Sequence, residues 1–162
     1  MPDATTNQTG AGQAPGSRVV HSDESGGWQG IATLPYKRAD GSWSGVTRQL
    51  LAGGPESPSS FELRYFELAP GGRSSHETHR HEHAVVVLRG SGEVLLAGAV
   101  HALRPGDFVR VAPGDPHQFR NTGNEPLGFL CVVDAERDAP TPLGKDGAPS
   151  CSVDSDELSR PR

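Results

Sequence analysis

The chain has 162 residues, which is enough for one domain with a hydrophobic core and too few for two. Its formal net charge is −5, and it has no cluster of lysine and arginine that could follow a phosphate backbone. No apolar run approaches the roughly 18 residues that would span a membrane, and the first residues do not form a secretion signal. We therefore expect neither nucleic acid nor a membrane as a partner.

The two ends of the chain have the composition of flexible tails. Residues 1–18 are small, polar and rich in glycine, which is typical of disorder. Residues 134–162 mix charge, proline and glycine without periodicity, so we expect most of them to be flexible, with part lying over the domain. Cys151 falls in this polar tail and Cys131 in an apolar stretch, so we expect free thiols and a cytoplasmic protein.

Between these tails the chain breaks into short apolar stretches separated by turns rich in glycine and proline. Glycine and proline account for 21 and 14 residues, and the core shows no apolar residues at helical spacing over three turns. This pattern is typical of an all-β sandwich or closed barrel. We expect residues 19–59 to form N-terminal strands or an arm packed on the barrel, and residues 60–133 to form its core. The expected strands cover residues 46–51, 61–68, 84–88, 93–98, 100–103, 108–111, 117–121 and 127–133.

The stretch SHETHRHEHAVVVLRG at residues 75–90 holds four of the chain's seven histidines. If it is one extended strand, alternate side chains share a face with the apolar residues that follow. That face carries Glu77, His79, His81 and His83. A solvent-facing polar edge is the alternative, but three alternating imidazoles that lead into an apolar run favour a bound metal ion. Metal sites draw ligands from separate segments, and His117 in GDFVRVAPGDPHQFRN is the candidate from a second segment.

The spacing around His117 resembles the second motif of the cupin family. That motif runs G, five residues, P-x-G, two residues, H, three residues and N. The matching residues are Gly106, Gly114, His117 and Asn121. The one departure is Ala112 at the place of the family's proline, and Pro113 beside it can shape the same turn.

The first cupin motif fits in spacing and differs in chemistry. It runs G, five residues, H-x-H, three or four residues, E, six residues and G, and here Gly71 and Gly90 fix the same register from both ends. The family's His, His and Glu become Glu77, His79 and His83. In this respect the chain is similar to small bacterial cupins whose first motif reads as a glutamate followed by alternating histidines.

The resemblance covers roughly residues 60–133 and implies one cupin β-barrel of the double-stranded β-helix or jelly-roll type, with flexible N- and C-terminal tails. It also implies one divalent transition metal per chain, and imidazole and carboxylate ligands suit iron, manganese, nickel, copper or zinc. The candidate ligands are His79, His83, His117, Glu77 and His81. If Glu77 does not bind the metal, it is the natural general base.

Other polar residues are weaker candidates for the site. Four strand residues could bind an anionic or hydroxylated substrate, or could simply face outward: Arg48, Arg64, Tyr65 and Arg110. We expect Asn121 to hold the backbone or a ligand histidine in place rather than to contact substrate.

Three functions remain open from the sequence. The favoured hypothesis is a mononuclear metal-dependent oxygenase, similar to a dioxygenase, acting on a small oxygenated or aromatic compound. The second is a redox-neutral isomerase or lyase of a sugar or keto acid, and the third is a non-catalytic module that binds a small ligand or a metal. The expected partner is a small molecule, and a homodimer is a further hypothesis.

Overall fold

The computed structural model describes residues 16–55, 57–144 and 146–149, and this part of the chain forms eleven strands and no helix. None of these residues therefore lies in a helix that could cross a membrane. The strands are β1 (Leu34–Pro35), β2 (Ser44–Ala52), β3 (Phe61–Arg73), β4 (Glu77–Thr78), β5 (His83–Arg89), β6 (Gly92–Leu96), β7 (Ala99–Leu103), β8 (Phe108–Val111), β9 (His117–Arg120), β10 (Leu127–Asp134) and β11 (Thr141–Pro142).

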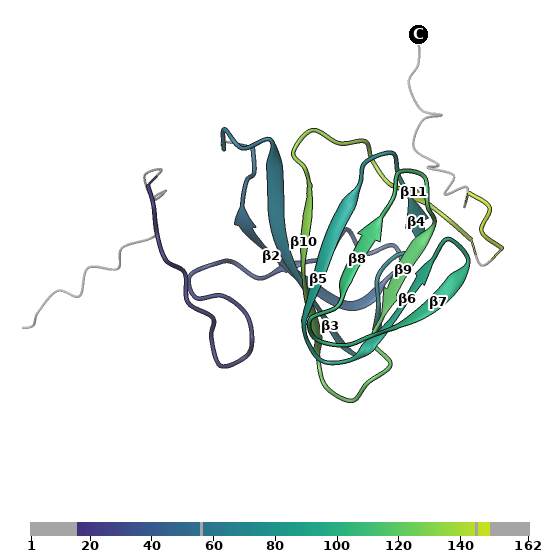
Figure 1. Ribbon diagram of the computed structural model, residues 1–162, viewed down its shortest axis with the longest axis horizontal. Helices are drawn as coiled ribbons and strands as arrows, with labels where there is room; N and C mark the ends of the chain where they lie inside the picture. The colour runs from purple at the N-terminus through teal and green to yellow at the C-terminus, as the bar shows by residue number, and fades with distance from the viewer. Residues whose placement is uncertain (1–15, 56, 145, 150–162) are drawn as a thin grey trace, which may run out of the picture.

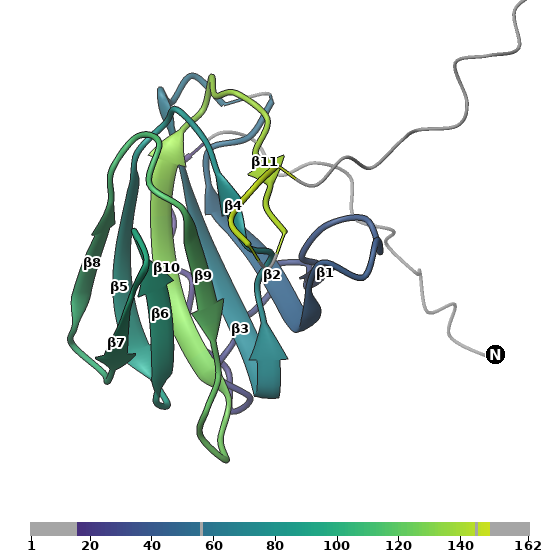
Figure 2. The same cartoon turned by 90° about the vertical axis from the view of Figure 1, so that its right-hand side faces the viewer.

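The strands form one antiparallel sheet that curls into a barrel, with β2 at one side and β7 at the other (Figure 1). Along the sheet the order is β11-β4-β9-β3-β10-β5-β8, while β2 pairs with β3 and β6 pairs with β9 and β7. The curl depends on β3, which pairs with β10 over residues 61–68 and with β9 only at Arg73. The long β3 therefore connects the two walls of the barrel, which Figure 2 shows from a second side.

Alternation along the strands puts one set of apolar side chains inside the barrel. In β5, for example, Val85 and Val87 are buried whereas Val86 and Leu88 are exposed. Burying one such side chain stabilises a fold by about 1.5–3 kcal/mol, so the inner set favours closure of the sheet. The buried apolar cluster consists of Val46, Phe66, Leu68, Val85, Val87, Val94, Leu103, Val109, Val111, Phe119, Leu127, Phe129, Cys131 and Val133.

Two glycines of the predicted motifs stand where the backbone requires them. Gly90 has a φ of 71°, and a Cβ there would lie 2.2 Å from the carbonyl oxygen of Pro126. Gly106 has a φ of 92° in the turn before β8. Both lie in the left-handed region, which glycine adopts without a steric penalty. The spacing of the motifs therefore reflects where the chain must turn as well as where the candidate ligands lie.

The predicted all-β barrel is confirmed, and each expected strand overlaps an observed one. The expectation of one continuous histidine strand is wrong, because β4 ends at Thr78 and β5 begins at His83. β4 pairs with β9 and β11, whereas β5 pairs with β10 and β8. The four residues between them must turn from one part of the curled sheet to another. Glu77, His79, His81 and His83 therefore do not share a face by strand alternation.

Residues 135–143, here called the C-terminal strap, lie against the histidine segment. β11 in this strap pairs with β4, and the backbone N–H of Leu143 donates to the carbonyl of His76 at 2.8 Å. The Asp138 carboxylate accepts the backbone N–H groups of Arg80 and His81 at 2.8 and 3.2 Å. Part of the segment predicted to be flexible thus holds the turn between β4 and β5.

The N-terminal arm also reaches the barrel interior. Tyr36 packs edge-on against both Trp43 and Phe66, with ring centroids 5.6 Å apart in each case. Residues 1–15 and 150–162, which include Cys151, lie outside the described residues, so the flexible tails predicted there stay a prediction.

Candidate functional site

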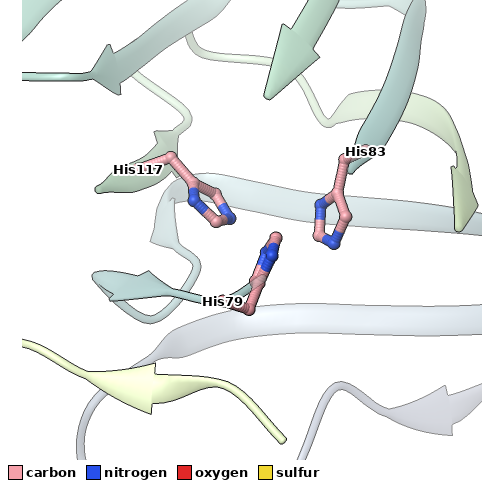
Figure 3. A group of neighbouring side chains, drawn as sticks. All are labelled: His79, His83 and His117. Atoms are coloured by element: carbon pink, nitrogen blue, oxygen red, sulfur yellow. The ribbon is translucent and has the colours of Figure 1, made fainter. Parts of the chain in front are cut away.

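Three histidines from separate elements converge inside the barrel. His79 follows β4, His83 begins β5 and His117 begins β9, and their rings point toward one another (Figure 3). One ring nitrogen from each lies within 4.8 Å of the other two, which is close enough for one ion to bind all three. His79 and His117 are buried and His83 is partly buried. The separation of β4 from β5 thus allows the imidazoles to surround a point, which a single strand could not do.

Hydrogen bonds leave two of these histidines with a free lone pair. The Nδ1 of His79 lies 2.7 Å from the carbonyl oxygen of His81, and the Nδ1 of His117 lies 3.1 Å from that of Asp115. Because a carbonyl can only accept, both Nδ1 atoms carry the proton and both Nε2 atoms are acceptors. The Nε2 of His79 is buried and has no hydrogen-bond partner. A metal ion would satisfy this atom, so the donor set fits a divalent transition metal.

The electrostatics of the site favour the neutral imidazoles that bind metals. Burial, reinforced by the neighbouring His117 and His81, lowers the pKa of His79 to about 4. Burial also lowers the pKa values of His83 and His117 below the ordinary range of a histidine. All three are therefore uncharged at neutral pH, and binding of a cation displaces no proton from them.

His81 lies beside this group rather than within it. Its ring stacks on that of His79 with centroids 3.8 Å apart, and its Nε2 lies 3.1 Å from the Nε2 of His83. Its Nδ1 lies 2.8 Å from the Asp138 carboxylate, and this hydrogen bond holds the pKa of Asp138 well below its usual range. His81 is thus oriented by the C-terminal strap and supports the rings of two candidate ligands.

Glu77 also lies outside the three-histidine group. It stands opposite His117 in the pairing of β4 with β9, but its carboxylate is bound by the ammonium of Lys37 and the hydroxyl of Ser75. Ser75 in turn lies 3.2 Å from the hydroxyl of Tyr36, whose pKa is raised by burial and by the charge of Glu77. The geometry gives no support to Glu77 as a direct ligand and leaves it as a buried carboxylate beside the site.

His83 and His117 line a cavity of about 380 Å³ that has an apolar wall and a basic one, whereas His79 lies behind them. The apolar wall includes Val85, Phe119 and Phe129. The basic side chains that line it are Lys37, Arg38, Arg48, Arg64 and Arg137. The whole chain carries a formal charge of −5, so the cluster of positive side chains at the cavity does not reflect the overall charge of the protein.

Only two of the four predicted substrate residues line this cavity. Arg48 and Arg64 do so, whereas Tyr65 and Arg110 do not. Tyr65 alternates with Arg64 along β3, so it lies on the face of the sheet away from the cavity, where it is buried and its hydroxyl donates to Glu67 at 3.1 Å. Arg110 alternates with the buried Val111 in β8 and forms an ion pair with Glu82 near the surface. These two residues are set aside as substrate contacts.

Asn121 holds the backbone, one of its two predicted roles. Its amide donates to the carbonyls of Leu68 and Glu125, both at 2.8 Å, and its Oδ1 accepts from the N–H of Gly123 at 2.9 Å. The side chain therefore fixes the turn before β10 and touches no ligand histidine.

Sequence reasoning missed the residues that the arm and the strap bring to the site. These are Tyr36, Lys37 and Arg38 from the arm, and Arg137, Asp138 and Pro140 from the strap. The arm was expected to pack on the barrel and part of the tail to lie over it, but neither segment has a motif that indicates which of its side chains reach the site. The one available signal was the pair of aromatic residues in the arm, Tyr36 and Trp43.

A curled all-β barrel with buried imidazoles from two motif segments defines a small barrel protein with a candidate metal site. The family model described as "Cupin domain" matches residues 64–133, which carry all three histidines of the group and most of the barrel. The chain belongs to the cupin family.

Similar proteins occur in bacteria. A 1-methylthio-D-xylulose 5-phosphate methylsulfurylase of Rhodospirillum rubrum is 45% identical over 114 residues, which cover 70% of this chain and 72% of that protein. The crystal structure of a cupin-2 domain from the same organism is 42% identical with a TM-score of 0.68, covering 74% of this chain and 80% of the other. A cupin 2 conserved barrel domain protein from Rhodopseudomonas palustris is 41% identical with a TM-score of 0.72, covering 80% and 89%.

Proposed function

We propose that the protein is a metal-dependent enzyme that acts on a small ketose phosphate, next to the carbonyl group. The observation that carries this proposal is the group of His79, His83 and His117, in which the Nε2 of His79 has no partner and two members line a cavity with a basic wall. The alignment with the relative from Rhodospirillum rubrum covers more than two thirds of both chains. The name of that relative gives a methylthio-substituted ketose phosphate as its substrate. That compound is the first substrate to test.

The residues of the chain divide the expected work among them. A metal held by the three histidines would act as a Lewis acid toward a substrate carbonyl. Phe119 and Phe129 line the cavity and keep bulk water from it, which strengthens charge interactions inside. The Glu77 carboxylate, in the same cavity, is the candidate base for a proton on the carbon beside the carbonyl. The ammonium of Lys37, which is bound to Glu77, balances the negative charge of the Glu77 carboxylate while that carboxylate is unprotonated.

A thiol in the cavity suits a substrate that carries sulfur. Cys131 is buried on the cavity wall, and its Sγ lies 3.5 Å from a terminal nitrogen of Arg64. Attack of its thiolate on the methylthio sulfur would form an S–S bond and break the C–S bond, and the electron pair left on the carbon beside the carbonyl would take up the proton that the thiol had released. An added thiol must then reduce the disulfide to regenerate Cys131. Burial raises the pKa of Cys131, and the neighbouring guanidinium opposes that effect.

The decisive experiment follows the methylthio protons of 1-methylthio-D-xylulose 5-phosphate by NMR, with metal-loaded protein and a thiol present. We expect the signal to be lost from the substrate with the intact protein and to persist with the His79→Ala, His117→Ala double variant. Cys131→Ser should bind the compound without releasing the methylthio group. His101→Ala is the matched control, because His101 is exposed in β7 away from the cavity. Persistence of the signal with every metal tested would contradict the proposal.

The oxygenase predicted from the sequence is the second candidate, and the same preparation tests it. Oxygen consumption that depends on the metal and on an added substrate would favour it, whereas turnover without oxygen favours the ketose phosphate enzyme. Binding of the compound without any turnover, under air or without it, would instead support the non-catalytic module.

A further inference from the structure

Arg48 and Arg64 come from neighbouring strands and face the same cavity. In the pairing of β2 with β3, Arg48 stands opposite Phe66, and Leu50 stands opposite Arg64. The two arginines are therefore diagonal neighbours, which lie within reach of long side chains across a sheet. Both line the cavity that His83 and His117 also line. The strand register thus brings two guanidinium groups together on one wall.

Neither arginine has an acidic partner among the described residues. Of the other three basic side chains that line the cavity, Lys37 pairs with Glu77 and Arg137 pairs with Glu62, whereas Arg38 is exposed to solvent. The Nε of Arg64 is buried without a hydrogen-bond partner, and the rest of its guanidinium contacts the thiol of Cys131 and the ring of Phe66. Arg48 donates only to the carbonyl of Pro35, at 3.3 Å.

Two unpaired guanidiniums on the wall of a sheltered cavity are an unfavourable arrangement on their own. Arginine cannot shed its proton to escape the desolvation penalty, and like charges repel more strongly where water is scarce. An oxyanion relieves both effects, because the planar guanidinium fork matches phosphate oxygens with two parallel hydrogen bonds. The thiol and the aromatic ring beside Arg64 supply no negative charge. The wall formed by Arg48 and Arg64 therefore has a place for an anion, since the Glu77 carboxylate elsewhere in the cavity is already paired with Lys37.

The strand register also fixes where the wall formed by Arg48 and Arg64 lies relative to the histidines. Cys131 of β10 stands between Arg64 of β3 and Val85 of β5, and His83 precedes Val85 by two residues. Two strand spacings separate β3 from β5, so the backbones of Arg64 and Val85 are roughly 10 Å apart. A ligand that reaches both groups must carry an anion at one end and metal-binding oxygens at the other.

We propose that Arg48 and Arg64 form an anion subsite that takes the phosphate of a phosphate monoester, while the three histidines take the oxygens at its far end. The link to substrate rests on the proposed function. The anion binding itself stands on the two arginines and can be measured without turnover.

The test measures binding of inorganic phosphate to the full-length protein by calorimetry, at constant ionic strength and with chloride as the comparison anion. We expect the His79→Ala, His117→Ala variant to bind phosphate as the unaltered protein does, because the arginines are unchanged in it. A phosphate that was bound to a metal on the histidines would instead lose its affinity in this variant. Arg64→Gln and Arg48→Gln should each weaken phosphate binding by roughly 10- to 100-fold, the usual range for a hydrogen bond to a charged group. Arg64→Lys should fall between Arg64→Gln and the unaltered protein, and Arg110→Gln should change nothing.

Two outcomes would overturn the subsite. One is phosphate binding no tighter than chloride binding in the unaltered protein; the other is unchanged phosphate affinity in folded Arg48→Gln and Arg64→Gln variants. If Arg64→Gln does not fold, Arg48→Gln and Arg64→Lys decide the question. If the arginine variants lose phosphate affinity but the unaltered protein converts no ketose phosphate, the anion subsite is supported and the proposed reaction is wrong.

Discussion

The histidine group and the arginine wall meet at one cavity, and removal from water has opposite consequences in the two regions. Burial lowers the pKa of His79, so its imidazole is neutral and the histidine region is ready for a cation. An arginine side chain has no neutral form at ordinary pH, so the wall formed by the half-buried Arg48 and Arg64 is ready for an anion. One sheltered cavity can therefore favour the two ends of a substrate that carries a phosphate and a metal-binding group.

The largest effect should come from breaking the histidine region. The double change His79→Ala, His117→Ala removes two of three nitrogens around the metal position, so we expect metal affinity to fall by more than about 100-fold. The barrel should remain folded, because both side chains lie beside the apolar core rather than in it. Metal content by elemental analysis, with circular dichroism for the fold, checks this. Metal content equal to that of the unaltered protein would remove the metal assignment.

A smaller effect should follow when the support of the histidine region is weakened from the strap. Asp138→Asn loses the charge that orients His81, whose ring packs on His79, so we expect metal affinity to fall by roughly tenfold. Competition with a chelator measures the affinity, and the visible spectrum of the cobalt-substituted protein reports a change in ligand geometry. Asp134→Asn, an exposed change at the end of β10, is the matched control. An unaltered spectrum and affinity would mean that Asp138 only ties down the backbone.

The neutrality of the histidine region predicts how stability depends on pH. The pKa of His79 is about 4 in the folded protein and near 6.5 in an unfolded chain, so between these values the unfolded state binds more protons. The free energy of unfolding of the metal-free protein should therefore fall as the pH falls from about 6.5 to 4, and this group should have no effect above that window. His83 and His117 act in the same direction, because their pKa values are also lowered. Urea unfolding across this pH range checks the sign, and a metal-free protein that gains stability toward pH 4 would contradict it.

The smallest effect should come from an arginine that is not part of the wall. Arg110→Ala removes an exposed ion pair with Glu82, which is worth about 0–1 kcal/mol, and touches neither the histidines nor the cavity. Metal and phosphate affinities should stay within about twofold of their original values, since surface changes rarely reach further. Thermal unfolding and calorimetry check both. A large loss of phosphate affinity in Arg110→Ala would show that an arginine outside the cavity also affects anion binding, which would contradict the assignment of phosphate to Arg48 and Arg64.

The sequence predicted most of the barrel and half of the cavity, for physical reasons. Strands with buried alternate residues and glycine turns, such as β5 before Gly90, carry their structure in their own pattern. The second motif placed His117 correctly because the turn and the strand that position it lie within the same few residues. The arginines could be recognised as interior candidates but not separated from Tyr65 and Arg110, because the sequence does not say which face of a strand is inside.

The error in the histidine segment has a similar cause. Alternating histidines predict a strand, and the local pattern holds no sign that the chain turns between Thr78 and His83. That turn is imposed by partners far along the chain, including Asp138, whose carboxylate binds the amides of Arg80 and His81. A long-range contact of this kind leaves no local periodicity, so pattern analysis cannot detect it.

The strap gives the protein an order of assembly. The segments that carry the three histidines and both arginines are complete once β10 has been synthesised, whereas Asp138 and β11 come later in the chain. The walls of the pocket can therefore form before the segment that braces the turn between β4 and β5 is available. Formation of the pocket and bracing of the candidate metal site thus become two separate events in time.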